Sequence, residues 1–291
     1  MKSYKILSVV AFATFLISAC GDDSSVSKAP EKLSNADMEV NKYKELPTCA
    51  EKREGKTAYV VDQDQGYICR NGEWIEKEVA VINKNIKYGS LKDSRDGRTY
   101  KTVVIGSQTW MAENLNYKTD DSYCYKDSAK NCDEYGRLYT WAAAMDSVGK
   151  WSTNGKGCGF TKTCSPKYPV RGVCPSGWHL PTKEEFETLF SSVGGISVAG
   201  EALKSINGWG DSGRDAYGFT ALHAGMRYDD GHYQKDGANF WSSTESGDYG
   251  AYLIYFETKS DDAQIFNYED ANCDQSSMEK NEGFSIRCVK N

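Results

Sequence analysis

The stretch of sequence that decides the fold is Val173-Cys174-Pro175-Ser176-Gly177-Trp178-His179-Leu180-Pro181-Thr182, followed directly by Lys183-Glu184-Glu185-Phe186. Thr182 and Glu185 have the spacing of a capping box, in which the hydroxyl accepts a first-turn amide proton and the carboxylate accepts the N–H of the cap residue. Apolar side chains then recur at helical spacing, at Phe186, Leu189, Phe190 and Val193. Because Gly194-Gly195 ends this pattern, the sequence predicts an amphipathic helix that starts at Thr182.

Outward from this helix, short segments of both kinds predict a mixed fold. Thr99–Ile105 is rich in β-branched residues and predicts a strand, whereas Tyr139–Ser147 and Val198–Ser205 predict short helices. Turn residues after Gly208 separate five predicted strands, at Tyr217–Leu222, Asn239–Ser242, Gly250–Phe256, Ala263–Tyr268 and Phe284–Val289. Helices early and antiparallel strands late predict one α+β domain with long loops over residues 91–291.

A smaller β unit is predicted before this domain, over residues 48–76. Cys49 and Cys69 bracket a strand-forming segment, and Asn71-Gly72 is a typical turn between two further strands. A segment this short encloses almost no apolar core. We therefore expect a disulfide between Cys49 and Cys69 to stabilise this unit. Residues 77–90 are predicted to link this unit to the main domain.

The first residues have the pattern of a bacterial lipoprotein signal. Positive charge at Lys2 and Lys5 precedes a mostly apolar stretch of twelve residues, 6–17, which is too short to span a bilayer as a helix. Two small residues then precede Cys20, and a cysteine directly after a cleavage site is the residue that receives diacylglycerol. We therefore expect residues 1–19 to be a signal peptide and Cys20 to carry the lipid.

Residues 20–47 are polar and charged, and the sequence predicts a flexible tether there because they offer few large apolar side chains to bury. Asp22 and Asp23 resemble the acidic tag that sends some lipoproteins to the cell surface. We therefore expect a protein anchored by lipid in the bacterial outer membrane and exposed at the cell surface, and several acyl chains would make that anchor firm.

The chain has ten cysteines, a number that suits a location outside the reducing cytoplasm. With Cys20 assigned to the lipid, we expect four disulfides, Cys49–Cys69, Cys124–Cys132, Cys158–Cys164 and Cys174–Cys288. Cys273 is left over, and because sequence does not fix connectivity, a different pairing that includes Cys273 stays open. Zinc fits less well, since the chain has no C-x-x-C pair and its three histidines lie far apart.

Charge and hydropathy exclude several kinds of partner. The net charge is −6 and no basic run exceeds two residues, so nucleic acid is not an expected partner. No apolar run after the signal approaches the length of a membrane span. Acidic side chains in turns could ligate calcium through their oxygens, at Asp211, Asp215, Asp229 and Asp230. Such residues are usually solvated, so no metal or cofactor is expected.

Five segments of the chain follow one another in a recognisable order, at residues 105–115, 136–145, 173–182, 240–245 and 285–290. They include Trp110-Met111-Ala112-Glu113-Asn114 and Phe240-Trp241-Ser242-Ser243. Together they resemble the Fibrobacter succinogenes major paralogous domain over roughly residues 91–291. One departure is His223, where that family more often has proline. The resemblance implies an exported, often lipidated surface protein and no particular reaction.

A more distant resemblance concerns the fold. The helix start at Leu180–Phe186 and the late segment Gly283–Arg287 also look like C-type-lectin-like and sulfatase-modifying folds. In those folds the first and last strands pair, and a long disulfide ties an early element to the last strand. Cys174–Cys288 would play that part. Because one fold can carry many functions, the function must be argued from a site.

The first functional hypothesis is a non-catalytic binding or adhesion module for a polysaccharide or a protein partner. Nineteen tyrosines and seven tryptophans offer many flat rings, and four in turn-rich segments are the candidate ligand contacts, Trp151, Trp209, Tyr228 and Tyr233. The last two flank a predicted hairpin turn at Asp229-Asp230-Gly231. Tryptophans inside the fold signatures are predicted to be core, namely Trp110, Trp141, Trp178 and Trp241.

Two other hypotheses stay open. An enzyme on a sulfatase-modifying fold would need a reactive cysteine pair near the C-terminus, where only Cys273 is unassigned, and the scattered histidines form no triad pattern. A structural surface or assembly component without a small ligand is the remaining hypothesis, and no sequence feature separates it from the first. We therefore assign no catalytic residue.

Overall fold

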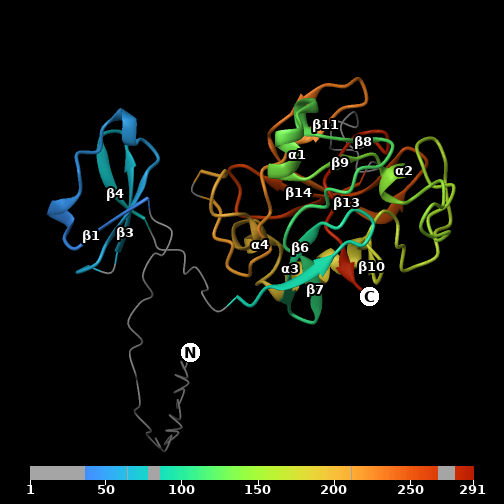
Figure 1. Cartoon of the computed structure of the whole chain (residues 1–291), viewed down its shortest axis with the longest axis horizontal. Coiled ribbons are helices and arrows are strands. Elements are labelled where there is room, and N and C mark those ends of the chain that lie inside the picture. Colours follow the sequence, from blue (N-terminus) through green and yellow to red (C-terminus); the bar gives the residue numbers. More distant parts are fainter. Residues whose placement is uncertain (1–36, 64, 78–85, 211, 268–278) are drawn as a thin grey trace, which may run out of the picture. The chain divides into compact units, whose positions relative to one another are not determined.

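A computed structural model describes residues 37–63, 65–77, 86–210, 212–267 and 279–291. The chain divides into two compact units, Met1–Glu76 and Lys77–Asn291, and each is described by itself (Figure 1). The predicted signal peptide, the lipid site Cys20 and the unassigned Cys273 lie outside the described residues. In the part that the structure describes, no helix is long and apolar enough to cross a membrane.

The small unit is a four-stranded sheet in the order of its strands along the chain, β1 (Met38–Val40), β2 (Thr57–Val60), β3 (Gln65–Arg70) and β4 (Glu73–Lys77). The predicted turn between β3 and β4 is confirmed, since Asn71 and Gly72 both have positive φ, at 49° and 87°. Short 3₁₀ turns lie at η1 (Tyr43–Glu45) and η2 (Glu51–Arg53).

The small unit begins earlier than predicted. Strand β1 pairs in parallel with β2, and Met38, Val40 and Leu46 pack against the buried side chains of the sheet. The carboxylate of Asp37 also accepts a hydrogen bond from the Thr57 N–H at 2.8 Å. The prediction of a tether over residues 20–47 is therefore wrong from residue 37 onward, because a few apolar side chains suffice to complete so small a core.

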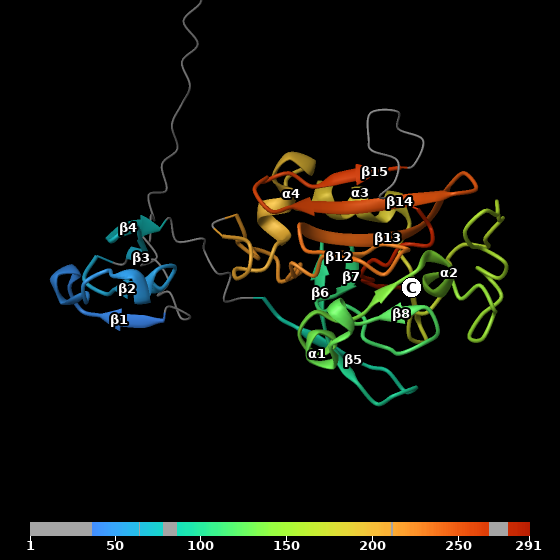
Figure 2. The same cartoon turned by 90° about the horizontal axis from the view of Figure 1, so that it is seen from above.

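The large unit contains two main sheets (Figures 1 and 2). The first has the order β10 (Trp178–His179), β16 (Val289–Lys290), β7 (Gln108–Met111), β6 (Thr99–Ile105) and β5 (Gly89–Lys92). The second is an antiparallel sheet of β13 (Gly237–Ser246), β14 (Gly250–Glu257) and β15 (Gln264–Phe266). Two small hairpin-like pairs are β8 (Ser122–Tyr123) with β9 (Leu138–Tyr139) and β11 (Met226–Arg227) with β12 (Tyr233–Gln234). Because β5 starts at Gly89, the ordered strands begin inside the predicted linker.

The helices are η3 (Tyr125–Asp127), α1 (Ala129–Tyr135), α2 (Trp141–Ala144), α3 (Lys183–Ser192) and α4 (Ile196–Leu203). The capping box of α3 is confirmed: the Thr182 hydroxyl accepts from the Glu185 N–H, and the Glu185 carboxylate accepts from the Thr182 N–H. Its apolar stripe packs with residues of β13 and β14 in one buried cluster. The α+β prediction is therefore confirmed.

Two predicted strands differ from the structure. Tyr217–Leu222 forms no strand, and Thr220 within it has a φ of 55°. Phe284–Val289 becomes a strand only at Val289, because Phe284 and Ser285 make isolated bridges to Tyr139 and Phe240 instead. In both segments, contacts with distant parts of the chain override the local preference for a strand.

Three fully buried cations lie inside the large unit, Lys204, Lys280 and Arg287. The Lys280 ammonium donates to the carbonyl oxygens of Lys162, Gly247 and Asp248 at 2.8–3.2 Å and to the Glu245 carboxylate at 2.5 Å. Arg287 donates to the Asn114 side chain and to three backbone carbonyls. Burial lowers the pKa of Arg287 to about 9. Most of these carbonyls lie in loops, outside the strand ladders, and that of Met111 lies at the end of β7.

Four disulfides join Cys49–Cys69, Cys124–Cys132, Cys158–Cys164 and Cys174–Cys288, the same pairs that were expected from the sequence. The four tryptophans of the fold signatures, Trp110, Trp141, Trp178 and Trp241, are buried, as predicted. The indole N–H of Trp141 donates to the Ser242 carbonyl and that of Trp241 to the Tyr139 carbonyl. These bonds tie β13 to the segment around β9 and α2.

Candidate ligand-binding site

Four tyrosines from two distant parts of the chain form one surface cluster, Tyr123, Tyr125, Tyr135 and Tyr233, called the tyrosine cluster below. The first three lie on β8, η3 and α1, whereas Tyr233 lies on β12. The hairpin β11–β12 brings Tyr233 to them, and its ring meets that of Tyr125 edge to face at 5.4 Å between centroids. The predicted turn at Asp229-Asp230-Gly231 closes this hairpin, with the Tyr228 N–H bonded to the His232 carbonyl.

Two cations fix the rings of this cluster. The Arg227 guanidinium lies 3.9 Å from the ring centroid of Tyr123 and 6.0 Å from that of Tyr233. The Lys235 ammonium lies 4.3 Å from the ring centroid of Tyr135 and donates to the Tyr135 hydroxyl at 2.9 Å. Such cation–π contacts are each worth about 0.5–1 kcal/mol at exposed sites, so the rings are held in place before any ligand arrives.

Three phenol groups of the cluster, those of Tyr123, Tyr125 and Tyr233, have a raised pKa and stay protonated at neutral pH. Burial, together with a hydrogen bond to Asp127 at 2.7 Å, raises the pKa of Tyr233 to about 12. Burial also raises the pKa of Tyr123 and Tyr125. Tyr123, Tyr135 and Tyr233 are nevertheless partly exposed, so each offers an apolar ring surface and a hydroxyl to solvent.

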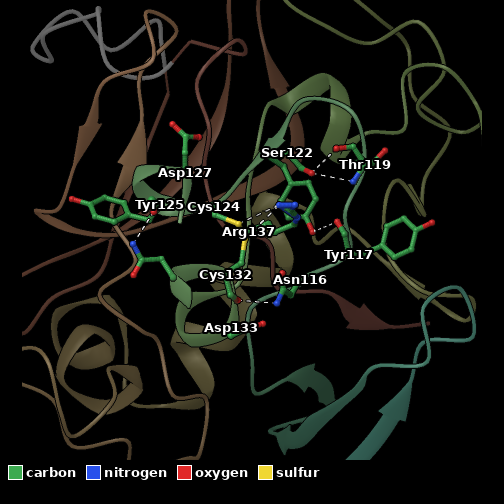
Figure 3. Close-up of a disulfide and its surroundings, with 12 residues drawn as sticks. Asn116, Tyr117, Thr119, Ser122, Cys124, Tyr125, Asp127, Cys132, Asp133 and Arg137 are labelled. Atoms are coloured by element: carbon green, nitrogen blue, oxygen red, sulfur yellow. Dashed lines mark hydrogen bonds between the residues drawn. A yellow bond between two sulfur atoms is a disulfide. The ribbon is translucent and has the colours of Figure 1, made fainter. Parts of the chain in front are cut away.

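The loop that carries Tyr125 and Asp127 is closed by the disulfide Cys124–Cys132 (Figure 3). Inside this loop the Asn131 side chain donates to the Tyr125 carbonyl at 2.7 Å, and the Asn116 side chain donates to the Cys132 carbonyl at 2.8 Å. Figure 3 shows Arg137 beside the two sulfur atoms, with Asp127 and Tyr125 on the other side of the disulfide. The disulfide therefore positions Tyr125 and Asp127, the two residues of this loop that contact Tyr233.

A polar pocket of about 290 Å³ shares Tyr135 with the cluster. Carboxylates and amides line much of it, at Glu113, Asn114, Asn116, Asp133 and Glu134. Both amides are engaged at its back, where Asn114 also holds the buried Arg287. The pocket offers hydrogen-bond acceptors next to an aromatic ring, a combination that suits a ligand rich in hydroxyl groups.

The four residues that the sequence predicted as ligand contacts do not form one site in the structure. Tyr233 lies in the tyrosine cluster. Tyr228 follows Arg227 on the hairpin, so its side chain leaves the opposite face, where it contacts His232 and Gln234. Trp151 lies in a different loop and packs against Tyr117, with Arg95 over both rings.

Trp209 is not a surface residue, so its assignment as a ligand contact is wrong. Its side chain is 1% exposed, and its indole N–H donates to the Ala221 carbonyl at 2.9 Å. The Lys204 ammonium lies 4.9 Å from its ring. The turn-rich sequence around Trp209 predicted an exposed residue, whereas in the structure its indole is buried.

The acidic residues considered for calcium do not converge. Asp215 is bonded to Thr220, and Asp230 to His232, whereas Asp211 is outside the described residues. In the described part of the chain, no group of three or more acidic, histidine or cysteine side chains is placed to hold a metal ion. The donor set therefore gives no support to the calcium alternative.

The three histidines have separate partners. His179 contacts Glu185 and Asn291, His223 contacts Thr258, and His232 contacts Asp230. Burial lowers the pKa of His179, but its hydrogen bonds to Glu185 and Asn291 outweigh burial and raise the pKa overall. These bonds tie β10 to α3 and to the residue after β16, which is a structural role.

Sequence reasoning missed Tyr123, Tyr125 and Tyr135, as well as the cations Arg227 and Lys235. One signal was available: the predicted disulfide Cys124–Cys132 closes a short loop that Tyr123 and Tyr125 flank and enter. The approach of the β11–β12 hairpin, about a hundred residues later in the chain, had no local signal.

The fold and the site define a class: a disulfide-braced α+β domain with a fixed, partly exposed aromatic cluster beside a polar pocket. A family model described as the Fibrobacter succinogenes major domain matches residues 103–290. The chain therefore belongs to this family, and the resemblance noted in the sequence is confirmed. No curated protein and no solved structure matched the chain.

Proposed function

We propose that this protein is an exported, lipid-anchored, non-catalytic binding module of the outer cell surface, and that its tyrosine cluster binds polysaccharide. The single observation that carries the proposal is the preorganised cluster. Tyr123, Tyr135 and Tyr233 are partly exposed, yet cations and hydrogen bonds fix their rings. Because rings that are already ordered lose little rotamer freedom on binding, most of the contact energy is left for affinity.

The chemistry around the rings suits sugars. A pyranose ring has apolar C–H faces and a rim of hydroxyl groups, so it needs a flat apolar surface bordered by donors and acceptors. Here the donors include Arg227 and Lys235, and the acceptors include Asp127. The adjoining pocket adds amides and carboxylates next to Tyr135. A neutral polysaccharide could therefore extend from the cluster into the pocket.

The architecture supports the same class of function. A C-type-lectin-like fold is the finer assignment that we propose for the large unit. In its favour, short helices precede an antiparallel sheet, and a disulfide ties Cys174, just before β10, to Cys288, just before β16. The first strand β5 lies at the far edge of the sheet from β10 rather than beside β16, which departs from the expected pairing of first and last strands.

Anchorage and location rest on the N-terminal sequence. The apolar stretch, the small residues before Cys20 and membership of the family support an exported lipoprotein. The disulfides of both units suit an oxidising environment. Replacing Cys20 by serine is expected to move the protein from the membrane fraction to the soluble fraction, and full retention in the membrane would contradict the anchor.

The test of binding uses the whole chain from residue 21, exported without a lipid, on a glycan array and in pull-downs with insoluble polysaccharides. Tyr233→Ala and Tyr135→Ala are expected to weaken polysaccharide binding by about tenfold or more each, since removing one stacked ring costs about 1.4 kcal/mol or more. Tyr233→Phe keeps the ring and is expected to retain most of the affinity.

The control is Tyr249→Ala, because Tyr249 is 46% exposed and lies at the turn between β13 and β14, where its ring contacts Phe160 instead. It should leave binding unchanged. Equal losses for Tyr233→Ala and Tyr249→Ala would exclude the cluster as the site. If no polysaccharide binds while a protein partner is captured, the structural or assembly role replaces the proposal.

A further inference from the structure

One of the four disulfides has a cation directly against its sulfur atoms. The Nη1 atom of Arg137 lies 3.5 Å from Sγ of Cys124 and 3.4 Å from Sγ of Cys132 (Figure 3). Arg137 is 8% exposed, and among the described residues no carboxylate pairs with its guanidinium. A disulfide is neutral and a weak acceptor, so in the oxidised state the sulfur atoms offer this positive charge no opposite charge.

The other three disulfides lack this arrangement in the described part of the chain. Cys174–Cys288 is fully buried, and Cys49–Cys69 has both residues at 5% exposure or less. Cys158–Cys164 is the closest match, because it also closes a short loop and Cys164 is partly exposed. Its flanking contact is a carboxylate, since the Cys164 N–H donates to Glu245. That carboxylate is paired with Lys280, so an ion pair lies beside Cys158–Cys164, whereas a guanidinium without a carboxylate partner among the described residues lies beside Cys124–Cys132.

We propose that Cys124–Cys132 is a thiol-reactive site, which a low-molecular-weight thiol or the dithiol of a partner protein opens reversibly. The arrangement favours the reduced state because a guanidinium beside sulfur stabilises a thiolate. It also favours the reaction itself, since exchange is faster when the departing thiolate is stabilised. Cys124 is the more exposed of the two residues, so the incoming thiolate attacks Sγ of Cys124.

The exchange proceeds in two balanced steps. The incoming thiol loses a proton to solvent, and its thiolate forms a bond to Sγ of Cys124 while the bond between the two cysteines breaks. The electron pair of that bond goes to Sγ of Cys132, which becomes a thiolate that the Arg137 guanidinium stabilises. A second thiol then attacks the incoming sulfur and releases Cys124. In total, two thiols are oxidised to one disulfide, and one protein disulfide is reduced to two cysteines.

Opening this disulfide would release the loop that holds Tyr125 and Asp127 against Tyr233. If the tyrosine cluster binds polysaccharide, as the proposed function has it, opening the disulfide would also switch that site off. The reactivity of the disulfide does not depend on polysaccharide binding and can be measured without any ligand.

The experiment exposes the purified protein to limiting reduced glutathione, or in parallel to a dithiol, at pH 7. Free cysteines are trapped by alkylation at successive times and located by peptide mapping. Cys124 and Cys132 are expected to be alkylated first, about tenfold faster than Cys158 and Cys164. Arg137→Gln is expected to slow their opening several-fold, Arg137→Lys is expected to keep most of the rate, and Cys158–Cys164 should be unaffected by either change.

The direction of the change separates charge from folding. A substitution that merely loosened the loop would expose the sulfur atoms and speed their opening, whereas loss of the positive charge slows it. Faster or unchanged opening in Arg137→Gln, or opening of Cys158–Cys164 before Cys124–Cys132, would overturn the proposal. Both results leave polysaccharide binding by the oxidised protein untouched, so the two proposals fail separately.

Discussion

The small unit and the large unit both carry disulfides, but the disulfides do different work in each. Among the described residues of the small unit, the buried apolar cluster is Ala58, Val60 and Tyr67, and Tyr59, Ile68 and one disulfide are also buried. The large unit has two large apolar clusters, three disulfides and three buried cations that bind loop carbonyls. The small unit therefore depends on its disulfide to fold, whereas the disulfides of the large unit add stability to a fold that has its own core.

The largest expected effect is in the large unit, on replacing both Cys174 and Cys288 by serine. Their disulfide joins residues 114 positions apart, so the chain-entropy estimate of its contribution is about 5 kcal/mol. The melting temperature of this unit should fall by roughly 10–20 °C, because its core still folds. Scanning calorimetry measures this directly. A complete loss of the folded state would show that the large unit depends on its staple as much as the small one does.

The second effect separates the units by pH. Burial, with Glu279 and Asp229 nearby, raises the pKa of Glu282 to about 8, and its side chain is 2% exposed. An acid whose folded pKa lies above its unfolded pKa binds its proton more tightly when folded. The stability of the large unit should therefore fall as pH rises from about 4.5 to 8, by roughly 4–5 kcal/mol at most.

The matched variant is Glu282→Gln, which keeps the shape and an acceptor for the Glu279 N–H but has no charge. It should match the natural protein near pH 4 and exceed its stability above pH 8, in urea unfolding at both pH values. In the small unit, the Thr57 N–H and Lys56 lower the pKa of Asp37, so that unit should lose stability only as pH falls. If the free energy of unfolding changed with pH in the same direction for both units, this predicted difference between them would be wrong.

The third effect is smaller in energy but decisive for the unit concerned. Cys49 and Cys69 are 20 positions apart, so replacing both by serine should cost about 3 kcal/mol. With so few core residues, the small unit should unfold while the large unit keeps its melting transition. Hydrogen exchange of residues 57–70 should rise to the rate of an unfolded chain. Persistent protection there would show that the sheet alone suffices.

Much of the local structure could be predicted because its causes are local. The capping box of α3, the Asn71-Gly72 turn and the hairpin turn at Asp229-Asp230-Gly231 each depend on side chains within a few residues of one another. Strand β1 was missed because its partner β2 is about twenty residues away and parallel pairing has no turn signal.

Two of the long-range misses have the same physical cause: buried polar groups need hydrogen-bond partners, which can come from distant parts of the chain. Tyr217–Leu222 has strand-forming residues, but Arg287 takes the carbonyls of Phe219 and Thr220, so they cannot join a ladder. Trp209 was predicted to be an exposed loop residue, but it is buried and its indole N–H donates to the Ala221 carbonyl. The tyrosine cluster forms only where residues 123–135 meet residues 227–235 in the fold. Of its four tyrosines, the sequence predicted only Tyr233 as a ligand contact.

Strand β16 lies in the interior of the five-stranded sheet, between β10 and β7. A polypeptide that leaves the ribosome or a translocation channel with its N-terminus first makes β7 long before residues 289 and 290 appear. The sheet therefore stays open, with unpaired backbone groups on β7 and β10, until this late strand arrives. Such delayed closure would keep the chain threadable during secretion and would give chaperones that recognise extended segments a place to bind.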